Sequence, residues 1–358
     1  MDTIQGRYQN YSVKTPGWKL MARVDWNINK NHAFNVRFST THNKYSSPPP
    51  NSISPLSGVY DYDNHGRTSD DALYFESARY YQELNFTSVA AELNSRFAEG
   101  RVNNILRATY SHQYEPRSYE GGLFPTVDIL QTDTNDKGEK TTGVLTTFGL
   151  DPFTYGSLRD VSTYMAGMQF EYNHTKNGYM PGGAGYYVYD SWDDFKKNAS
   201  PTAFAITHAN RNDLKQTYPS FNYMQYSIYA QDELRISPRL KATIGVRLEV
   251  PIYPSLDNNE NGEFTKLFAA NGGYKTSDMP KARVSVSPRF GFNWDMTGER
   301  KYIMRGGTGI FTGHLPFVWI ISAVGNSNCI QAQNILYSSK KDKMPGFHPG
   351  LGDILNDL

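Results

Sequence analysis

The sequence has little of three things that would assign it to a familiar class of protein. Cys329 is its single cysteine, which excludes an internal disulfide and a cysteine metal cluster and is most simply a packed thiol. The formal net charge is +1, too balanced to suggest a nucleic-acid partner. No stretch approaches the roughly 18 consecutive apolar residues of a transmembrane helix.

The beginning of the chain also lacks a recognisable export signal. Residues 1–12, MDTIQGRYQNYS, have neither a basic start nor an apolar core, so the chain is expected to be cytosolic or a fragment. Aromatic residues, in contrast, are abundant. They make up 14% of the chain and include 26 tyrosines, which favours β structure over helix bundles. The mean hydropathy is negative, yet a membrane barrel stays open because half of each strand would face a polar lumen.

The clearest pattern lies between Tyr223 and Pro251, where two alternating runs flank a turn at 237–239. On the second run one face is apolar and the other polar: Leu240, Ala242, Ile244, Val246, Leu248 and Val250 against Lys241, Thr243, Gly245, Arg247 and Glu249. The first run alternates in the same way, with Asp232 out of place. A period of two predicts a hairpin with unlike faces, and its strands exceed the about five or six residues usual in soluble sheets.

Similar patterns predict more hairpins along the chain. They fall at 20–28 with 33–41, at 87–97 with 102–110, and at 283–295 with 301–313. Residues 162–175 predict one further strand, for which 141–149 and 157–164 are both poor partners. That mismatch suggests an internal deletion or a partly unfolded segment.

Short and long connections alternate between these strands. The short ones lie near 29–32, 98–101, 237–239 and 296–300; the long ones lie near 42–82, 116–160, 176–221 and 252–282. A soluble sandwich gives no reason for this sorting, whereas an outer-membrane barrel has short periplasmic turns and long extracellular loops. We therefore predict an all-β fold: an incomplete antiparallel transmembrane β-barrel of about nine or ten long strands over 1–320, located in the outer membrane. Residues 321–358 are expected to be an unpatterned tail or the start of another extracellular loop.

Two segments then resemble a known family. Tyr229–Glu249, YAQDELRISPRLKATIGVRLE, resembles the YxQDxWxxxPxLTLxxGxRYE segment of TonB-dependent outer-membrane receptors, with Leu234 in place of the tryptophan. Ser287–Trp319 resembles their SPRxGFxxDxxGxxKTxLRGGxGxFxGRxPFxW segment, and Gly185–Phe195 fits their extracellular loops. The Bacteroidetes-type receptors with a carboxypeptidase-regulatory-like domain are the most similar variety.

The resemblance implies a function and partners. Family members close barrels of about 22 strands around a plug domain. A substrate docks on the extracellular loops, and an energised TonB-type inner-membrane complex pulls on the plug. Plug, TonB box and terminal aromatic strand are not recognisable here, so a middle piece of a receptor barrel is expected. The implied activity is active uptake of a nutrient (a glycan, peptide or chelate), with outer-membrane lipid, the TonB-type complex and a surface lipoprotein as expected partners.

Candidate site residues follow from the two faces. No catalytic residue, cofactor or metal ligand is predicted. Charged residues expected to face the lumen, unless they pair with one another or with a plug, are Arg23, Arg37, Arg107, Lys241, Arg247, Glu249 and Arg289. Aromatic residues expected at the water–lipid boundary are Trp26, Tyr226, Trp294 and Tyr302.

Some readings stay open or weak. Residues 257–262 copy the opening of a calcium loop, but Phe268 occupies the twelfth position where glutamate is needed, so a surface loop fits better. The acidic residues in 51–71 are equally ambiguous. An adhesin or structural barrel that binds a partner through its loops remains an alternative to transport. A soluble carbohydrate-acting enzyme is a third reading, without a clear carboxylate pair.

Overall fold

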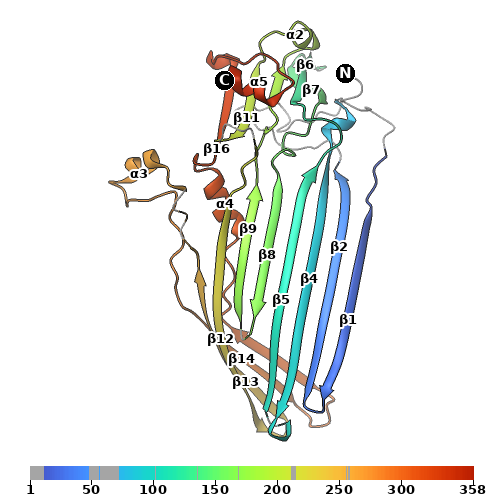
Figure 1. Cartoon of the computed structure of the whole chain (residues 1–358), viewed down its shortest axis with the longest axis vertical. Coiled ribbons are helices and arrows are strands. Elements are labelled where there is room, and N and C mark those ends of the chain that lie inside the picture. The colour runs from blue at the N-terminus through green and yellow to red at the C-terminus, as the bar shows by residue number, and fades with distance from the viewer. Residues whose placement is uncertain are drawn as a thin grey trace.

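The computed structural model describes residues 12–47, 56, 72–100, 102–134, 136–167, 169–210, 215–254, 256 and 259–358. They form two β-sheets: a tall ten-stranded sheet, called the wall, and a six-stranded sheet across one end of it, called the cap (Figure 1). Among these residues no helix is both long and apolar enough to cross a membrane.

The wall is antiparallel throughout, and its two edge strands do not meet. Its strands, in spatial order, are β1 (Gly17–Asn29), β2 (His32–Ser47), β4 (Tyr80–Phe97), β5 (Val102–Ser118), β8 (Leu158–Ala166), β9 (Phe170–Gly178), β12 (Ser220–Ser237), β13 (Leu240–Ile252), β14 (Ser285–Asp295) and β15 (Ile303–Gly309). The predicted incomplete antiparallel barrel with short turns and long connections is confirmed.

The strand register gives the wall one apolar and one polar face. Ile228 lies opposite Leu248 and Leu248 opposite Val286, so apolar side chains line up across three strands. The intervening residues Ser227 and Glu249 lie opposite each other on the other face. Helix α4 (Phe317–Gly325) covers the upper part of the polar face, where its apolar side chains pack against Phe221 and Tyr223 of β12.

The prediction of a single strand at 162–175 is wrong. These residues lie in two strands, β8 and β9, which form a hairpin whose last pair is Ala166 opposite Phe170. β8 then pairs with β5 and β9 with β12, so every strand has its partner and no deletion is needed to explain the pairing. Segment 157–164 supplies most of β8, whereas 141–149 belongs to the cap.

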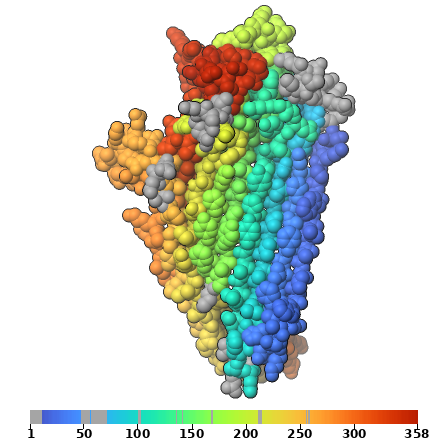
Figure 2. Space-filling model, viewed as in Figure 1, coloured from blue at the N-terminus to red at the C-terminus, as the bar shows by residue number. Residues whose placement is uncertain are grey.

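The cap is built from the long connections, which we expected to be irregular. Its strands, in spatial order, are β16 (Gln331–Tyr337), β11 (Ala203–Ala209), β10 (Tyr186–Tyr189), β6 (Thr126–Thr134), β7 (Lys140–Phe148) and β3 (Leu73–Tyr74). The expected unpatterned tail thus contains β16 and, beyond it, helix α5 (Leu351–Asp357). Figure 2 shows that the C-terminal segment and the loop elements form one continuous mass at this end of the wall.

The remaining elements are short. Helix α2 (Trp192–Lys196) begins after Ser191, whose hydroxyl accepts a hydrogen bond from the backbone N–H of Asp194. Helix α3 (Gly262–Phe268) projects to the side of the wall (Figure 1). The 3₁₀ turns η1 (Glu76–Ala78), η2 (Ala98–Gly100) and η4 (Ser338–Lys340) complete the description.

Strand β10 explains how the cap is stabilised. Tyr186 and Val188 pack in one hydrophobic cluster, while Tyr187 and Tyr189 pack in a second cluster with Ile354 of α5. All four side chains of the strand are therefore inaccessible to solvent. Two cores, one on each face, make the cap a folded sheet in its own right.

Gly149 supports a tight contact at the end of β7. Its φ is +87°, and a Cβ would lie 1.9 Å from the carbonyl oxygen of Pro125. Gly138, in the β6–β7 turn, has a similar φ of +81° with nothing within 4 Å of its Cβ position. We expect Gly149→Ala to reduce the free energy of unfolding of the cap by about 2 kcal/mol more than Gly138→Ala, because only the first adds a collision to the backbone strain. Urea titration of the detergent-solubilised protein, with unfolding of the cap detected by its susceptibility to proteolysis, measures the stability of both variants. Equal losses of stability would contradict a collision between the added Cβ and the Pro125 carbonyl.

Candidate functional site

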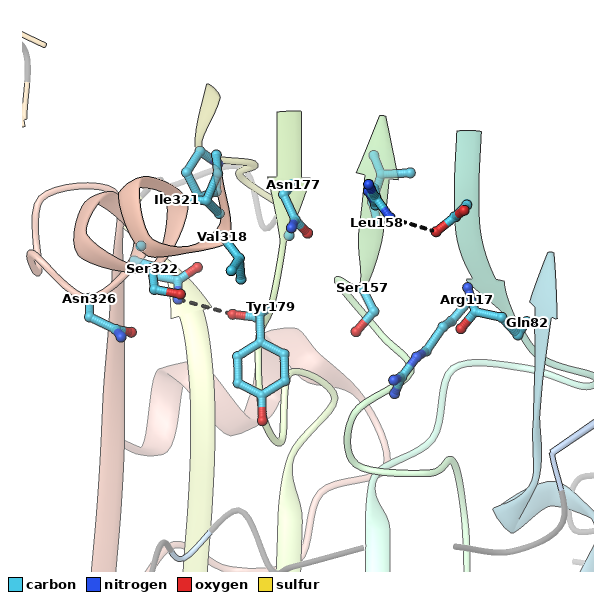
Figure 3. Close-up of a pocket in the computed structure, with 16 residues that line it drawn as sticks. Gln82, Arg117, Ser157, Leu158, Asn177, Tyr179, Val318, Ile321, Ser322 and Asn326 are labelled. Atoms are coloured by element: carbon cyan, nitrogen blue, oxygen red, sulfur yellow. Dashed lines mark hydrogen bonds and ion pairs between the residues drawn. The ribbon is translucent and has the colours of Figure 1, made fainter. Parts of the chain in front are cut away.

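A pocket lies at the capped end of the polar face, between the wall and α4. Its volume is about 390 Å³, and its walls come from β4, β5, β8, β9, α4 and the start of β16. In Figure 3 the α4 side chains Val318, Ile321 and Ser322 lie on one side and those of the strands on the other, with Tyr179 between them. A second cavity of about 610 Å³ continues down the wall and shares Arg159 and Asn177 with the first.

The two arginines of the pocket are held by different contacts. Arg159 Nη1 lies 3.6 Å from Glu115 Oε2 of the neighbouring strand. Arg117 donates a hydrogen bond to the carbonyl of Phe153 at 3.1 Å and lies over the ring of Tyr80, with its Cζ 4.4 Å from the ring centroid. Arg159 is just over half exposed, so it can bind a ligand without first losing all of its contacts.

Neutral donors and acceptors make up most of the remaining lining. Gln331 Nε2 donates to the carbonyl of Tyr179 at 3.2 Å and so ties the cap strand β16 to the end of β9. The ring of Tyr179 stacks on that of Phe153 at 5.9 Å. Desolvation raises the pKa of the Tyr179 hydroxyl, with Arg117 acting in the opposite direction, so the hydroxyl remains a hydrogen-bond donor at neutral pH. Amide, hydroxyl, guanidinium and aromatic groups together suit a polar, uncharged or weakly anionic ligand.

The seven predicted lumen residues all lie on the polar face of the wall, but none of them lines either cavity. Register places Arg23 opposite Arg37, and Glu92 between Asn35 and Arg107. Arg107 Nε is 2.6 Å from Glu92 Oε2. Arg23 pairs instead with Asp25 of its own strand, at 2.6 Å.

The other four predicted lumen residues lie on the β12–β15 side of the wall. Arg247 and Glu249 form an ion pair at 2.8 Å, and Gln225 donates to the same carboxylate at 2.8 Å. Lys241 pairs with Glu233 at 2.6 Å, and Arg289 lies over the ring of Phe311 at 5.0 Å. Six of the seven residues, all but Arg37, thus make separate local contacts along the polar face rather than one cluster.

The predicted boundary aromatics lie on the opposite face. Along their strands, Trp26, Tyr226 and Trp294 occupy positions between the residues of the polar face, so their side chains point to the apolar face. They are 61%, 49% and 40% exposed. Tyr302 immediately precedes β15 and is also exposed. The sequence prediction missed a row of neighbouring, mutually tilted rings on this face, formed by Tyr110, Tyr164 and Tyr172 with centroid distances of 4.9 and 6.0 Å. These three residues are adjacent only across strands, so a single-strand pattern does not connect them.

The residues of the calcium-like loop have other partners. Asn259 donates to the carbonyl of Thr276 and accepts from Ser327, while Asn261 caps α3 and donates to the Ser327 carbonyl. Asp257 and the acidic residues of 57–71 lie outside the described residues. Within the described part of the chain, no group of three or more His, Cys, Asp or Glu residues could hold a metal ion.

Comparison with known protein families decides the class of this protein. The model of a family described as an outer membrane beta barrel domain matches residues 2–349. The chain belongs to the outer-membrane β-barrel domain family. Its place is therefore the outer membrane, and the predicted localisation is confirmed. Comparison with curated protein sequences gives no match.

Two solved structures are similar in outline to this β-barrel chain. The outer membrane transporter YddB from Escherichia coli has a TM-score of 0.39 and 12% identity, over 82% of this chain and 38% of that one. The ferric-catecholate import receptor Fiu from E. coli K12, in its closed form, has a TM-score of 0.34 and 12% identity, over 82% of this chain and 42% of that one. The chain thus spans less than half the length of either transporter.

Proposed function

We propose that this β-barrel chain takes part in active, TonB-dependent uptake of a nutrient, and that its polar face lines the lumen. The observation that supports the proposal is the pair of adjoining cavities at the capped end of the polar face, because a ligand held there would lie on the lumen side of the wall. Uptake rather than catalysis suits this lining, and the receptor-like segments of the sequence agree with it.

The path of the nutrient follows from the two faces. A ligand would first contact the cap and the cavity beside Arg159 and Tyr179. It would then pass along the separate charged pairs of the polar face, of which Arg247–Glu249 is the most buried. Energy would come from a TonB-type complex acting on a plug domain, and a surface lipoprotein is a candidate partner at the cap. The nutrient classes we propose to test are glycans, peptides and metal chelates.

Uptake by intact cells tests the proposal. Cells that carry the complete gene are expected to accumulate a labelled oligosaccharide, peptide or chelate, and a protonophore is expected to stop accumulation while leaving surface binding. Arg159→Ala is expected to weaken binding about tenfold, since one charge-assisted hydrogen bond contributes roughly 1.5 kcal/mol. Lys266→Ala in α3, which lines neither cavity, is the control. Binding that is never followed by protonophore-sensitive accumulation would favour the adhesin alternative.

A further inference from the structure

The β8–β9 hairpin ends well before its neighbours do. β8 pairs with β5 from Pro116 to Ala108, and the Gly167 N–H then donates to the Arg107 carbonyl at 2.9 Å. Val102–Leu106 of β5 therefore have no neighbour on that side among the described residues. β9 pairs with β12 only from Ser220 to Tyr226, which leaves Ile228–Ser237 with β13 as its one strand neighbour in the described chain. Figure 1 shows β8 and β9 stopping above the lower ends of β5 and β12. We call the space between these two free edges the notch.

The notch lies within the apolar band of the wall. Ala166, the last residue of β8, is level with Ala108 and Ala91 in the strand register. One row further toward the short turns, the same face still carries Leu106, Leu93, Phe34 and Trp26. Free backbone N–H and C=O groups at this depth would meet hydrocarbon, which offers no hydrogen-bond partner. Among the described residues the outer edges of β1 and β15 border no other strand, whereas the notch is bounded on three sides by this chain.

A charged side chain marks the free edge of β12. Asp232 falls on the apolar face, with Ile228 and Ile236 above and below it and Ile244 opposite. Its carboxylate makes no hydrogen bond or ion pair with the described residues, and an unpaired carboxylate facing lipid is unfavourable. Glu233, the next residue, instead faces the polar side and pairs with Lys241 at 2.6 Å. Asp232 is thus left for a basic group supplied from the notch.

We propose that the notch receives a β-hairpin of a partner polypeptide, which completes the wall between β5 and β12. Where the notch begins, β8 and β9 hold β5 and β12 three strand spacings apart, or roughly 14 Å. The free edge of β5 offers about five residues, or roughly 17 Å of strand. β5 runs away from the short-turn end and β12 runs toward it. A hairpin that enters from this periplasmic side therefore pairs antiparallel with both edges.

The side chains of the two edges define the partner further. Its outward residues are apolar, to continue the face of Leu106 and Ile228, and its inward residues are polar. A lysine or arginine on its outward face lies opposite Asp232. Backbone pairing supplies affinity and the alternating side chains supply specificity, as in other cases of strand addition. The inference depends on placement in the outer membrane and is independent of whether the barrel transports a nutrient.

Hydrogen–deuterium exchange tests the proposal. In outer membranes isolated from the native cells, residues 102–106 and 228–237 are expected to exchange slowly. After purification of this chain alone in detergent, exchange there is expected to become at least a hundredfold faster. Residues 224–226, which have strand neighbours on both sides, are the internal control and stay protected in both samples. Fast exchange in both samples would mean an empty notch, and slow exchange in both would mean that the wall closes on itself; either result overturns the proposal.

Two variants separate the notch from general loosening of the wall. Lengthening the β8–β9 turn by about twelve alternating residues fills the notch within the chain, and both segments are then expected to be protected in detergent as well. Asp232→Arg is expected to abolish protection of 228–237 in native membranes while leaving 224–226 unchanged. The control, Glu263→Arg in α3, alters a charge of the same sign outside the wall. Full protection in the Asp232→Arg variant would overturn the assignment of a basic partner residue.

Discussion

Replacing Tyr187 with alanine is expected to reduce the free energy of unfolding of the cap by about 3–5 kcal/mol, the loss usual for a buried aromatic side chain. Tyr187 is fully buried on β10, where its ring packs against Phe204 at 4.8 Å and Phe347 at 5.3 Å. Its removal leaves a cavity between β10 and the C-terminal segment that packs on it. Pulse proteolysis in urea, with the cap fragments identified by mass, measures the loss.

Tyr187→Phe is the matched control. It keeps the ring and removes only the hydroxyl, which donates to the carbonyl of Gly346 at 3.2 Å. The expected loss is about 1 kcal/mol, the net contribution of one ordinary hydrogen bond. If the phenylalanine and alanine variants were equally unstable, the hydrogen bond rather than the packing of the ring would hold the C-terminal segment on the cap.

Glu249→Ala is expected to destabilise the wall by about 3 kcal/mol, because it leaves a charged partner without compensation. The carboxylate is 6% exposed and accepts hydrogen bonds from Arg247 and Gln225, both at 2.8 Å. Once it is removed, Arg247 keeps a contact of 3.3 Å with the Ser227 hydroxyl but loses its ion pair. Unfolding of the detergent-solubilised protein in guanidinium, monitored by tryptophan fluorescence, measures the loss of stability.

The same hairpin offers the control for this variant. Glu233 and Lys241 form an ion pair of 2.6 Å on the same face of β12 and β13, but both side chains are largely exposed. Glu233→Ala is expected to leave the unfolding midpoint unchanged within error, because exposed ion pairs contribute little. Similar losses for Glu233→Ala and Glu249→Ala would show that burial of the carboxylate is not what makes its pair stabilising.

The wall was predictable because each of its strands places apolar side chains on one face and polar side chains on the other. At Leu240–Ile252 this separation gives a strict period of two, and the predicted hairpin has the observed partners. The same rule misled us at β8 and β9. A three-residue turn between Ala166 and Phe170 keeps the parity, so both strands continue one apparent alternation. Periodicity alone does not distinguish that hairpin from a single strand. Gly167 is a residue type common in turns, and in the structure its φ is +64°.

The cap and the pocket were not predictable for different reasons. β10 is buried on both faces, so YYVY is a continuous apolar run that carries no period of two. The pocket joins Arg117, Tyr179 and Ser322, which are brought together by strand register and by the docking of α4. Their separation in the sequence exceeds any local pattern. The charged pairs of the wall, in contrast, lie within one strand or on neighbouring strands and share the face that alternation predicts.

The construction of the cap has a consequence for the order of folding. Each wall hairpin joins residues that are close in the sequence, whereas the Tyr337 hydroxyl donates to the carbonyl of Leu56, 281 residues away, at 3.0 Å. Contacts of such high sequence separation form late, because a long loop must close before they contribute any stability. The cap therefore assembles only after the connections from the whole length of the chain have reached the same side of the membrane. The cap can therefore form correctly only if the wall hairpins have been inserted in the direction that brings these connections together.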